Sequence, residues 1–190
     1  MVDLNNLSKV LIPGKVGGLI IVDVQSILLE VINRKDVIKE NIVRLIKLAK
    51  LYNLPIILTE QYPKWLKDTI YEIKDELPYY DPIDKMEFDC TKKQEFQKRL
   101  NDLKGKKEVI LTGIETHICI FQTAIGLLKM GYNVHCPQDA VGSRREDNWR
   151  VGLDLMHGAG AAITSSETII FQFLERAGTR EFREIMRYVK

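Results

Sequence analysis

The sequence predicts an α/β protein in which helices cover both faces of a central, mostly parallel sheet. Short aliphatic runs recur along the chain, and the run over residues 19–22 (Leu-Ile-Ile-Val) shows no polar alternation. A strand of this composition has to be covered on both faces. Stretches with apolar residues at helical spacing, such as 38–48, separate these runs. Alternation of this kind favours a three-layer α/β/α sandwich.

The expected elements follow one another in that order. The helix over 38–48, with apolar residues spaced near 3.6, precedes a strand that begins at Pro55. The segment 60–89 contains Pro63, Pro78 and Pro82 and little periodicity, so we expect long loops with short helical turns there. The predicted strands are 19–22, 55–59, 109–112, 133–136 and 161–164, and the later predicted helices are 91 to about 103, 117–130, 145–157 and two more that close the chain.

The composition is that of an ordinary globular domain. We expect one domain, 1–190, with 45% apolar and 28% charged residues. The net charge of +2 is spread along the chain, so no nucleic-acid partner is expected. No apolar run is long enough to span a bilayer, and no signal peptide is recognisable, so we expect no membrane association. Cys90, Cys119 and Cys136 stand at unrelated spacings, which indicates free thiols in a cytoplasmic protein.

Polar residues gather where the predicted strands end. In open parallel sheets, sites form at the carboxyl ends of the strands. Asp23 and Gln25 follow the first strand, 59–61 (Thr-Glu-Gln) follows the second, and 113–119 follows the strand over 109–112. These segments therefore define the candidate site.

Two residues of this set have the chemistry of a hydrolase. Cys119 lies just inside a predicted helix that follows a strand, where the helix dipole and nearby N–H groups are expected to lower the pKa of its thiol. The alternative is a buried structural thiol, which is the role that Cys136 fits better. Asp23 ends an apolar run, so it is either a general base or a turn former that caps the next helix.

Other candidates are weaker on spacing alone. Lys85 lies in the proline-rich segment, and most lysines are solvated surface charges. His117 precedes Cys119 by two positions, so on a helix it would point away from the thiol and serve as a packing or capping group. Arg144 and Arg145 are either a solvated helix start or groups that reach an anionic substrate or a neighbouring subunit.

Several segments together match a known family. They are 20–25 (Ile-Ile-Val-Asp-Val-Gln), 85–88 (Lys-Met-Glu-Phe) and, most specifically, 111–120 followed by Gln-Thr-Ala at 122–124. The stretches 131–134 and 139–144 also fit. In these motifs the chain resembles the isochorismatase-like cysteine hydrolases, from about Gly18 to the end. Residues 60–63 (Glu-Gln-Tyr-Pro) look most like the uncharacterised isochorismatase-domain branch, which is related to nicotinamidases.

The resemblance implies a catalytic triad of Asp23, Lys85 and Cys119. It also implies a six-stranded sheet, a non-proline cis peptide between Ile114 and Glu115, and usually a homo-oligomer. The chain has no histidine before His117, which departs from the metal-binding segment of nicotinamidases, so we expect no metal and no cofactor. We place the oxyanion hole at the N–H groups of Glu115 and Cys119, and the substrate-binding residues at Gln25, Gln61, Tyr62, Phe88 and Thr116.

The expected activity is cysteine-dependent hydrolysis of a small molecule. We expect a C–N bond of amide type to be cleaved through a thioester intermediate. One alternative is isochorismatase-type hydrolysis of a vinyl ether without a cysteine nucleophile. The other is a ligand-binding or interaction protein that keeps the fold without turnover.

Overall fold

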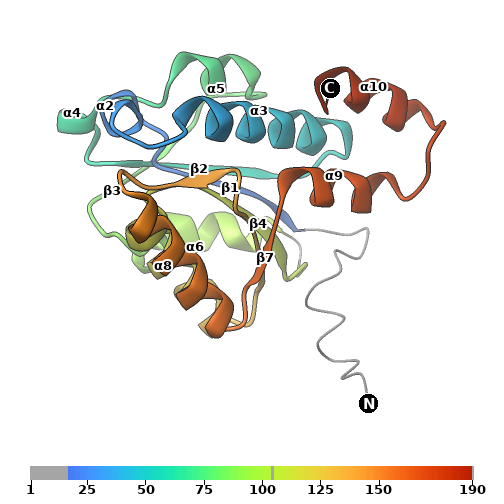
Figure 1. Ribbon diagram of the computed structural model, residues 1–190. Coiled ribbons are helices and arrows are strands. Elements are labelled where there is room, and N and C mark those ends of the chain that lie inside the picture. The colour runs from blue at the N-terminus through green and yellow to red at the C-terminus, as the bar shows by residue number, and fades with distance from the viewer. Residues whose placement is uncertain (1–16, 104, 190) are drawn as a thin grey trace.

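The computed structural model describes residues 17–103 and 105–189. Within these residues, seven parallel strands form one sheet in the order β3-β2-β1-β4-β5-β7, with β6 paired to β4 (Figure 1). The strands are β1 (Gly18–Val22), β2 (Ile56–Gln61), β3 (Ile83–Lys85), β4 (Glu108–Ile114), β5 (Asn133–Pro137), β6 (Val141–Gly142) and β7 (Ala162–Thr164). The helices are α2 (Ser26–Glu30), α3 (Lys35–Leu51), α4 (Pro63–Leu66), α5 (Tyr71–Glu76), the 3-10 helix η1 (Cys90–Lys92), α6 (Gln94–Asn101), the π-helix η2 (Thr116–Ile120), α7 (Phe121–Lys129), α8 (Glu146–Gly158), α9 (Ser166–Leu174) and α10 (Arg180–Val189).

Two apolar cores lie on the two faces of the sheet. Side chains alternate between the faces of a strand, so Leu19 and Ile21 of β1 enter one core while Ile20 and Val22 enter the other. Helices α3, α5, α9 and α10 cover the first face, and α6 and α8 lie on the opposite face (Figure 1). The predicted three-layer α/β architecture is therefore confirmed.

The middle of the chain contains one strand that the sequence did not predict. The short helices α4 and α5 correspond to the expected helical turns in 60–89, whereas the strand β3 was not expected. β3 has only three residues, and its exposed Asp84 separates the buried Ile83 and Lys85. The sequence therefore contains no aliphatic run that would predict this strand. β3 and the two-residue β6 raise the five strands predicted from the sequence pattern to seven in the described chain, one more than the six that the resemblance implied.

Gly113 allows the central strands β1 and β4 to meet closely beside the candidate site. Its φ is 118°, a conformation that favours glycine. A Cβ atom at this position would lie 2.0 Å from the carbonyl oxygen of Val22. Any other residue would therefore push β1 and β4 apart where Asp23 leaves the sheet.

His135 is a buried histidine without a hydrogen-bond partner in the described part of the chain. It lies in β5, and neither ring nitrogen is paired. Burial lowers its pKa below the usual value, and the charge of Glu108 opposes this only in part. Because the unfolded chain binds a proton near pH 6.5 that the folded chain resists, stability is lost as the pH falls below about 6.5, by at most about 1.4 kcal/mol per pH unit.

We expect His135→Leu to flatten this pH dependence between pH 6.5 and 5, because an apolar residue removes the titrating group. The free energy of unfolding measured by urea denaturation across that range tests the expectation. His157→Leu, on the exposed part of α8, is the control that should keep the slope of the wild type. An unchanged slope in His135→Leu would contradict the assignment.

Candidate active site

Asp23 lies directly beyond β1, at the carboxyl edge of the sheet. Its φ is 56°, a left-handed conformation that Asp tolerates better than most residues. The carboxylate is fully buried. It accepts a hydrogen bond from the Thr59 hydroxyl to Oδ1 at 2.7 Å and one from Lys85 Nζ to Oδ2 at 2.6 Å. The buried charge is thus compensated by one cation and one hydroxyl.

Lys85 ends β3 and points its ammonium into the same site. The side chain is buried, and Nζ also donates to Gln61 Oε1 at 2.6 Å and to the Glu87 carbonyl at 3.2 Å. Burial lowers the pKa of Lys85, but attraction to Asp23 and to the nearby thiols outweighs it, so the pKa is raised overall. Lys85 therefore remains an ammonium although it is buried.

Cys119 completes the group from the opposite side. It lies in η2, a single π-helical turn that precedes α7, whereas an ordinary helix start was expected. Its Sγ is 3.9 Å from Lys85 Nζ, and the residue is 6% exposed. The structure brings all three predicted triad residues together.

The expected lowering of the Cys119 pKa is wrong. Burial raises the pKa of this thiol, the Asp23 charge and a hydrogen bond to Asp23 raise it further, and Lys85 only partly compensates. The prediction considered the helix dipole but could not include a buried carboxylate contributed by β1. Burial and the neighbouring carboxylate thus favour the neutral thiol over the thiolate.

The peptide bond between Ile114 and Glu115 is cis, as the resemblance implied. The Glu115 carboxylate is held by Arg144, which donates through its backbone N–H at 2.9 Å and through Nε at 3.1 Å. Two residues further on, His117 Nδ1 lies 3.0 Å from the Ser143 hydroxyl. The turn that leads to Cys119 is thus fixed by the loop after β6, and Arg144 serves this turn rather than standing free at a helix start.

Two of the predicted substrate-binding residues make hydrogen bonds within the protein. Gln25 is fully buried, and its amide bonds only to backbone groups of Gln61 and Lys67. The Gln61 amide bonds to Lys85 and to the Met86 carbonyl. The hydrogen-bonding groups of both amides are used within the protein, and contact of either residue with a substrate stays a prediction. Spacing could not show these hydrogen bonds, because β3 was not predicted.

The remaining predicted pocket residues differ in exposure. Tyr62 is 38% exposed and packs beside Trp65, with the rings tilted by 43° and their centroids 6.5 Å apart, and Phe88 is 52% exposed. Both follow the strands that carry the site, so they remain candidates for substrate contact. The Thr116 hydroxyl is buried and has no partner within the described chain. A buried hydroxyl without a partner is rare.

The sequence did not assign roles to three further residues around the site. Thr59 binds the Asp23 carboxylate, and Cys90 lies behind it with Sγ 3.9 Å from the Thr59 hydroxyl. Burial raises the pKa of Cys90 to about 12, so this thiol stays neutral. Glu60 accepts from Thr69 and Tyr80 and so ties the segment between β2 and β3 to the sheet. The parallel pairing of β1 with β2, which places Thr59 opposite Val22, would have indicated the contact between Thr59 and Asp23.

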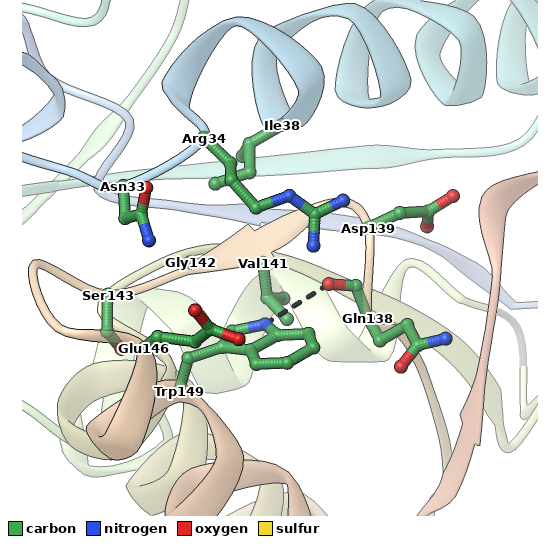
Figure 2. Close-up of a pocket in the computed structure, with 10 residues that line it drawn as sticks. All are labelled: Asn33, Arg34, Ile38, Gln138, Asp139, Val141, Gly142, Ser143, Glu146 and Trp149. Carbon is green, nitrogen blue, oxygen red and sulfur yellow. Dashed lines mark hydrogen bonds between the residues drawn. The ribbon is translucent and has the colours of Figure 1, made fainter.

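A pocket separate from the triad lies between the start of α3 and α8 (Figure 2). It is a small hollow, partly open to solvent, with an accessible volume of about 20 Å³, and none of the triad residues lines it. The Arg34 guanidinium lies 6.0 Å from the centre of the Trp149 ring, and Trp149 donates to the Gln138 carbonyl at 3.2 Å. Ser143 borders this pocket while contacting His117, so the pocket adjoins the turn that carries Cys119.

Neither a metal site nor a membrane helix is evident in the described residues. No group of three or more His, Cys, Asp or Glu side chains there is arranged to hold an ion. Over residues 17–103 and 105–189, no helix has the length and apolar character needed to cross a bilayer.

Comparisons with known proteins agree with the resemblance. The family described as isochorismatase domain matches residues 18–168. A secreted isochorismatase effector, Isc1, of Phytophthora sojae is 38% identical over 149 residues, which are 77% of this chain and 71% of the effector. Mouse isochorismatase domain-containing protein 2A is 37% identical over 147 residues, covering 77% and 69% of the two chains. The structure of MAR1 ribonuclease from Caenorhabditis elegans superposes with a TM-score of 0.86 at 34% identity, covering 94% and 91%.

Proposed function

The chain belongs to the isochorismatase family, and we propose that it is a cysteine-dependent hydrolase that cleaves an amide-type C–N bond of a small molecule. One observation carries the proposal. The Lys85 ammonium lies between a buried carboxylate and a buried thiol, 2.6 Å from Asp23 Oδ2 and 3.9 Å from Cys119 Sγ. A nucleophile beside a base whose charge is held by a third group is the arrangement of covalent catalysis.

The proposed reaction begins with the proton of the Cys119 thiol. As the sulfur attacks the carbonyl carbon of the substrate, this proton moves to Asp23, because the thiol is protonated at rest. Lys85 keeps its charge beside both groups throughout. The tetrahedral oxyanion is bound by the N–H groups of Glu115 and Cys119, each such donor being worth about 2.7–4 kcal/mol.

The intermediate then collapses to products. The C–N bond breaks, Asp23 returns the proton to the leaving nitrogen, and an amine or ammonia departs while the acyl group stays on sulfur. A water molecule gives one proton to Asp23 and attacks the thioester carbonyl. The carboxylic acid leaves, and the proton returns to the Cys119 sulfur. The net change is amide plus water to acid plus amine.

The vinyl ether alternative receives less support from the site. Isochorismate carries carboxylates that need cationic partners. The N–H groups of Lys85 are directed at Asp23, Gln61 and Glu87, and Arg144 is paired with Glu115. A neutral amide makes no such demand. The interaction-protein alternative does not explain why the charged pair of Asp23 and Lys85 is buried, although burying two charges is costly.

Acid quenching followed by mass spectrometry tests the proposal. The protein is mixed with a panel of aliphatic and aromatic amides, with isochorismate, and with single-stranded RNA, since one similar structure is named a ribonuclease. We expect the acyl mass of an amide substrate on the peptide that contains Cys119, together with release of amine. Turnover of isochorismate or RNA without an adduct would favour those reactions, and stable partners without turnover would favour an interaction protein.

We further propose a cytoplasmic homo-oligomer. Val151 and Leu155 stand one turn apart on α8 and are 52% and 51% exposed, which supports contact with another subunit. Cys90, Cys119 and Cys136 are free and buried, which fits a reducing compartment. Light scattering measures the first property and cell fractionation the second. A monomer, or protein in the medium as for a secreted effector, would contradict them.

A further inference from the structure

The amide of Gln61 lies between a group that only donates hydrogen bonds and a group that only accepts them. Its Oε1 accepts from Lys85 Nζ at 2.6 Å, and its Nε2 donates to the Met86 carbonyl at 2.9 Å. Because an ammonium has no acceptor and a carbonyl no donor, the orientation of the amide is fixed by its partners. A carboxylate at this position would face the Met86 carbonyl with a second oxygen, and an apolar side chain would leave both partners unsatisfied.

Gln25 in turn holds the backbone of Gln61. Its Oε1 accepts from the Gln61 N–H at 2.7 Å, while Nε2 donates to the carbonyls of Gln61 at 2.9 Å and Lys67 at 2.6 Å. The β1–β2 pairing ends at Val22 and Thr59, so the Gln25 side chain replaces a strand neighbour just beyond that end. Gln61 is thereby fixed at both its backbone and its side chain.

The Lys85 ammonium has more acceptors around it than it has protons. Its three N–H groups face three oxygen acceptors, Asp23 Oδ2, Gln61 Oε1 and the Glu87 carbonyl, at 2.6, 2.6 and 3.2 Å. The fourth acceptor, Cys119 Sγ, is 3.9 Å away and receives the longest of these contacts. Asp23 consequently receives one N–H from Lys85 and one hydroxyl from Thr59, and keeps acceptor capacity for the thiol proton.

We propose that Gln61, held by Gln25, is a positioning residue. It accepts one N–H of Lys85 and so keeps this N–H away from the sulfur, while a second N–H binds Asp23. In this arrangement Asp23 takes the proton of Cys119. The inference rests on the proposed function and extends it to a residue that acts through Lys85. Without Gln61, the N–H of Lys85 that this amide takes at 2.6 Å is free to strengthen the long contact with the sulfur. With a carboxylate in its place, the site has a second negative charge close to the thiol.

Two substitutions should therefore change the reactivity of Cys119 in opposite directions. In Gln61→Glu, the added negative charge raises the thiol pKa, and we expect iodoacetamide to alkylate Cys119 about tenfold more slowly at pH 7.5, which corresponds to about one pKa unit. In Gln61→Leu, the released N–H stabilises the thiolate, and we expect alkylation to become faster while kcat for an amide substrate falls and KM changes little. The pH profile of alkylation, with the adduct located by mass spectrometry, measures both.

Gln97 provides the matched control. Its Nε2 also donates to a backbone carbonyl, that of Thr91 at 2.8 Å, and it makes no contact with Lys85 in the described structure. Gln97→Glu and Gln97→Leu should keep the wild-type alkylation profile. A purely structural role for Gln61 would change reactivity in the same direction in both of its variants, with a matching loss of thermal stability, and that outcome would overturn the inference.

A second measurement separates this inference from the proposed function. If wild-type Cys119 does not react at any pH, the proposed nucleophile fails, whereas the tie between Gln61 and Lys85 is still measured by NMR titration of the Lys85 Cε signal. Losing a hydrogen bond to the charged form lowers a lysine pKa and adding a negative charge raises it. We therefore expect the Lys85 pKa to fall in Gln61→Leu and to rise in Gln61→Glu. Equal Lys85 titration in both variants and the wild type would overturn the inference by itself.

Discussion

If the proposed mechanism holds, replacing Cys119 by alanine is expected to lower kcat for an amide substrate by about 10⁴- to 10⁶-fold, the usual cost of removing a covalent nucleophile. The reason is that the thioester cannot form, while Asp23 and Lys85 remain in place to hold each other. Binding should persist, because the sulfur fills little of the site. Steady-state kinetics, with substrate binding measured by calorimetry, test this expectation.

Cys136 is the control for this substitution. It is a fully buried thiol outside the site, so Cys136→Ala should lose some stability but keep turnover. Cys119→Ser retains a hydroxyl, which is a weaker nucleophile, and should stay close to the alanine variant. Turnover of isochorismate by Cys119→Ala at the wild-type rate would instead identify the vinyl ether reaction.

Removing Lys85 alone is expected to destabilise the protein by about 3–5 kcal/mol, because it leaves a buried carboxylate without its cation. The side chains of both Lys85 and Asp23 are fully buried, and only Thr59 would still compensate the charge. Lys85→Met should therefore lose both activity and stability. In the double variant Asp23→Asn/Lys85→Met no charge is left unpaired, so stability should largely return while activity stays absent.

Urea denaturation of the two single variants and the double variant measures this coupling. Arg150→Met is the matched control, since it breaks an ion pair with Glu146 whose side chains are 66% and 54% exposed. It should change the free energy of unfolding far less, because exposed pairs are screened by water. A Lys85→Met variant as stable as the wild type would contradict this coupling between Lys85 and Asp23.

The strands that the sequence predicts are those whose side chains enter the two cores. The aliphatic run of β1 is found within one residue of its expected bounds, because burial on both faces leaves no freedom for polar residues. β3 was not predicted, because this edge strand of three residues contains only one buried aliphatic residue, Ile83. Its last residue, Lys85, reads as a surface charge until the pairing with Gln61 is known.

The site was predictable in position and less so in electrostatics. The rule on strand ends places Asp23 and Cys119 near each other, and the family motifs add Lys85. The raised pKa of Cys119 depends on the distance between β1 and η2, which no local pattern encodes. The tasks of Gln25 and Gln61 likewise depend on hydrogen bonds across 24 and 36 residues of chain. The features that could not be predicted are therefore those that depend on contacts between residues far apart in the sequence.

The three triad residues come from segments that are far apart in the sequence, and this affects how the chain folds. Asp23 and Lys85 are 62 residues apart, and Lys85 and Cys119 are 34 apart, while β1 lies at the centre of the sheet between β2 and β4. Pairings of this separation form slowly, because long loops must close before the contacts are made. The burial of Cys119 beside Asp23 and Lys85 arises only when the segments that carry these three residues have come together. During refolding, the loss of its accessibility to a thiol reagent should therefore time the completion of the sheet.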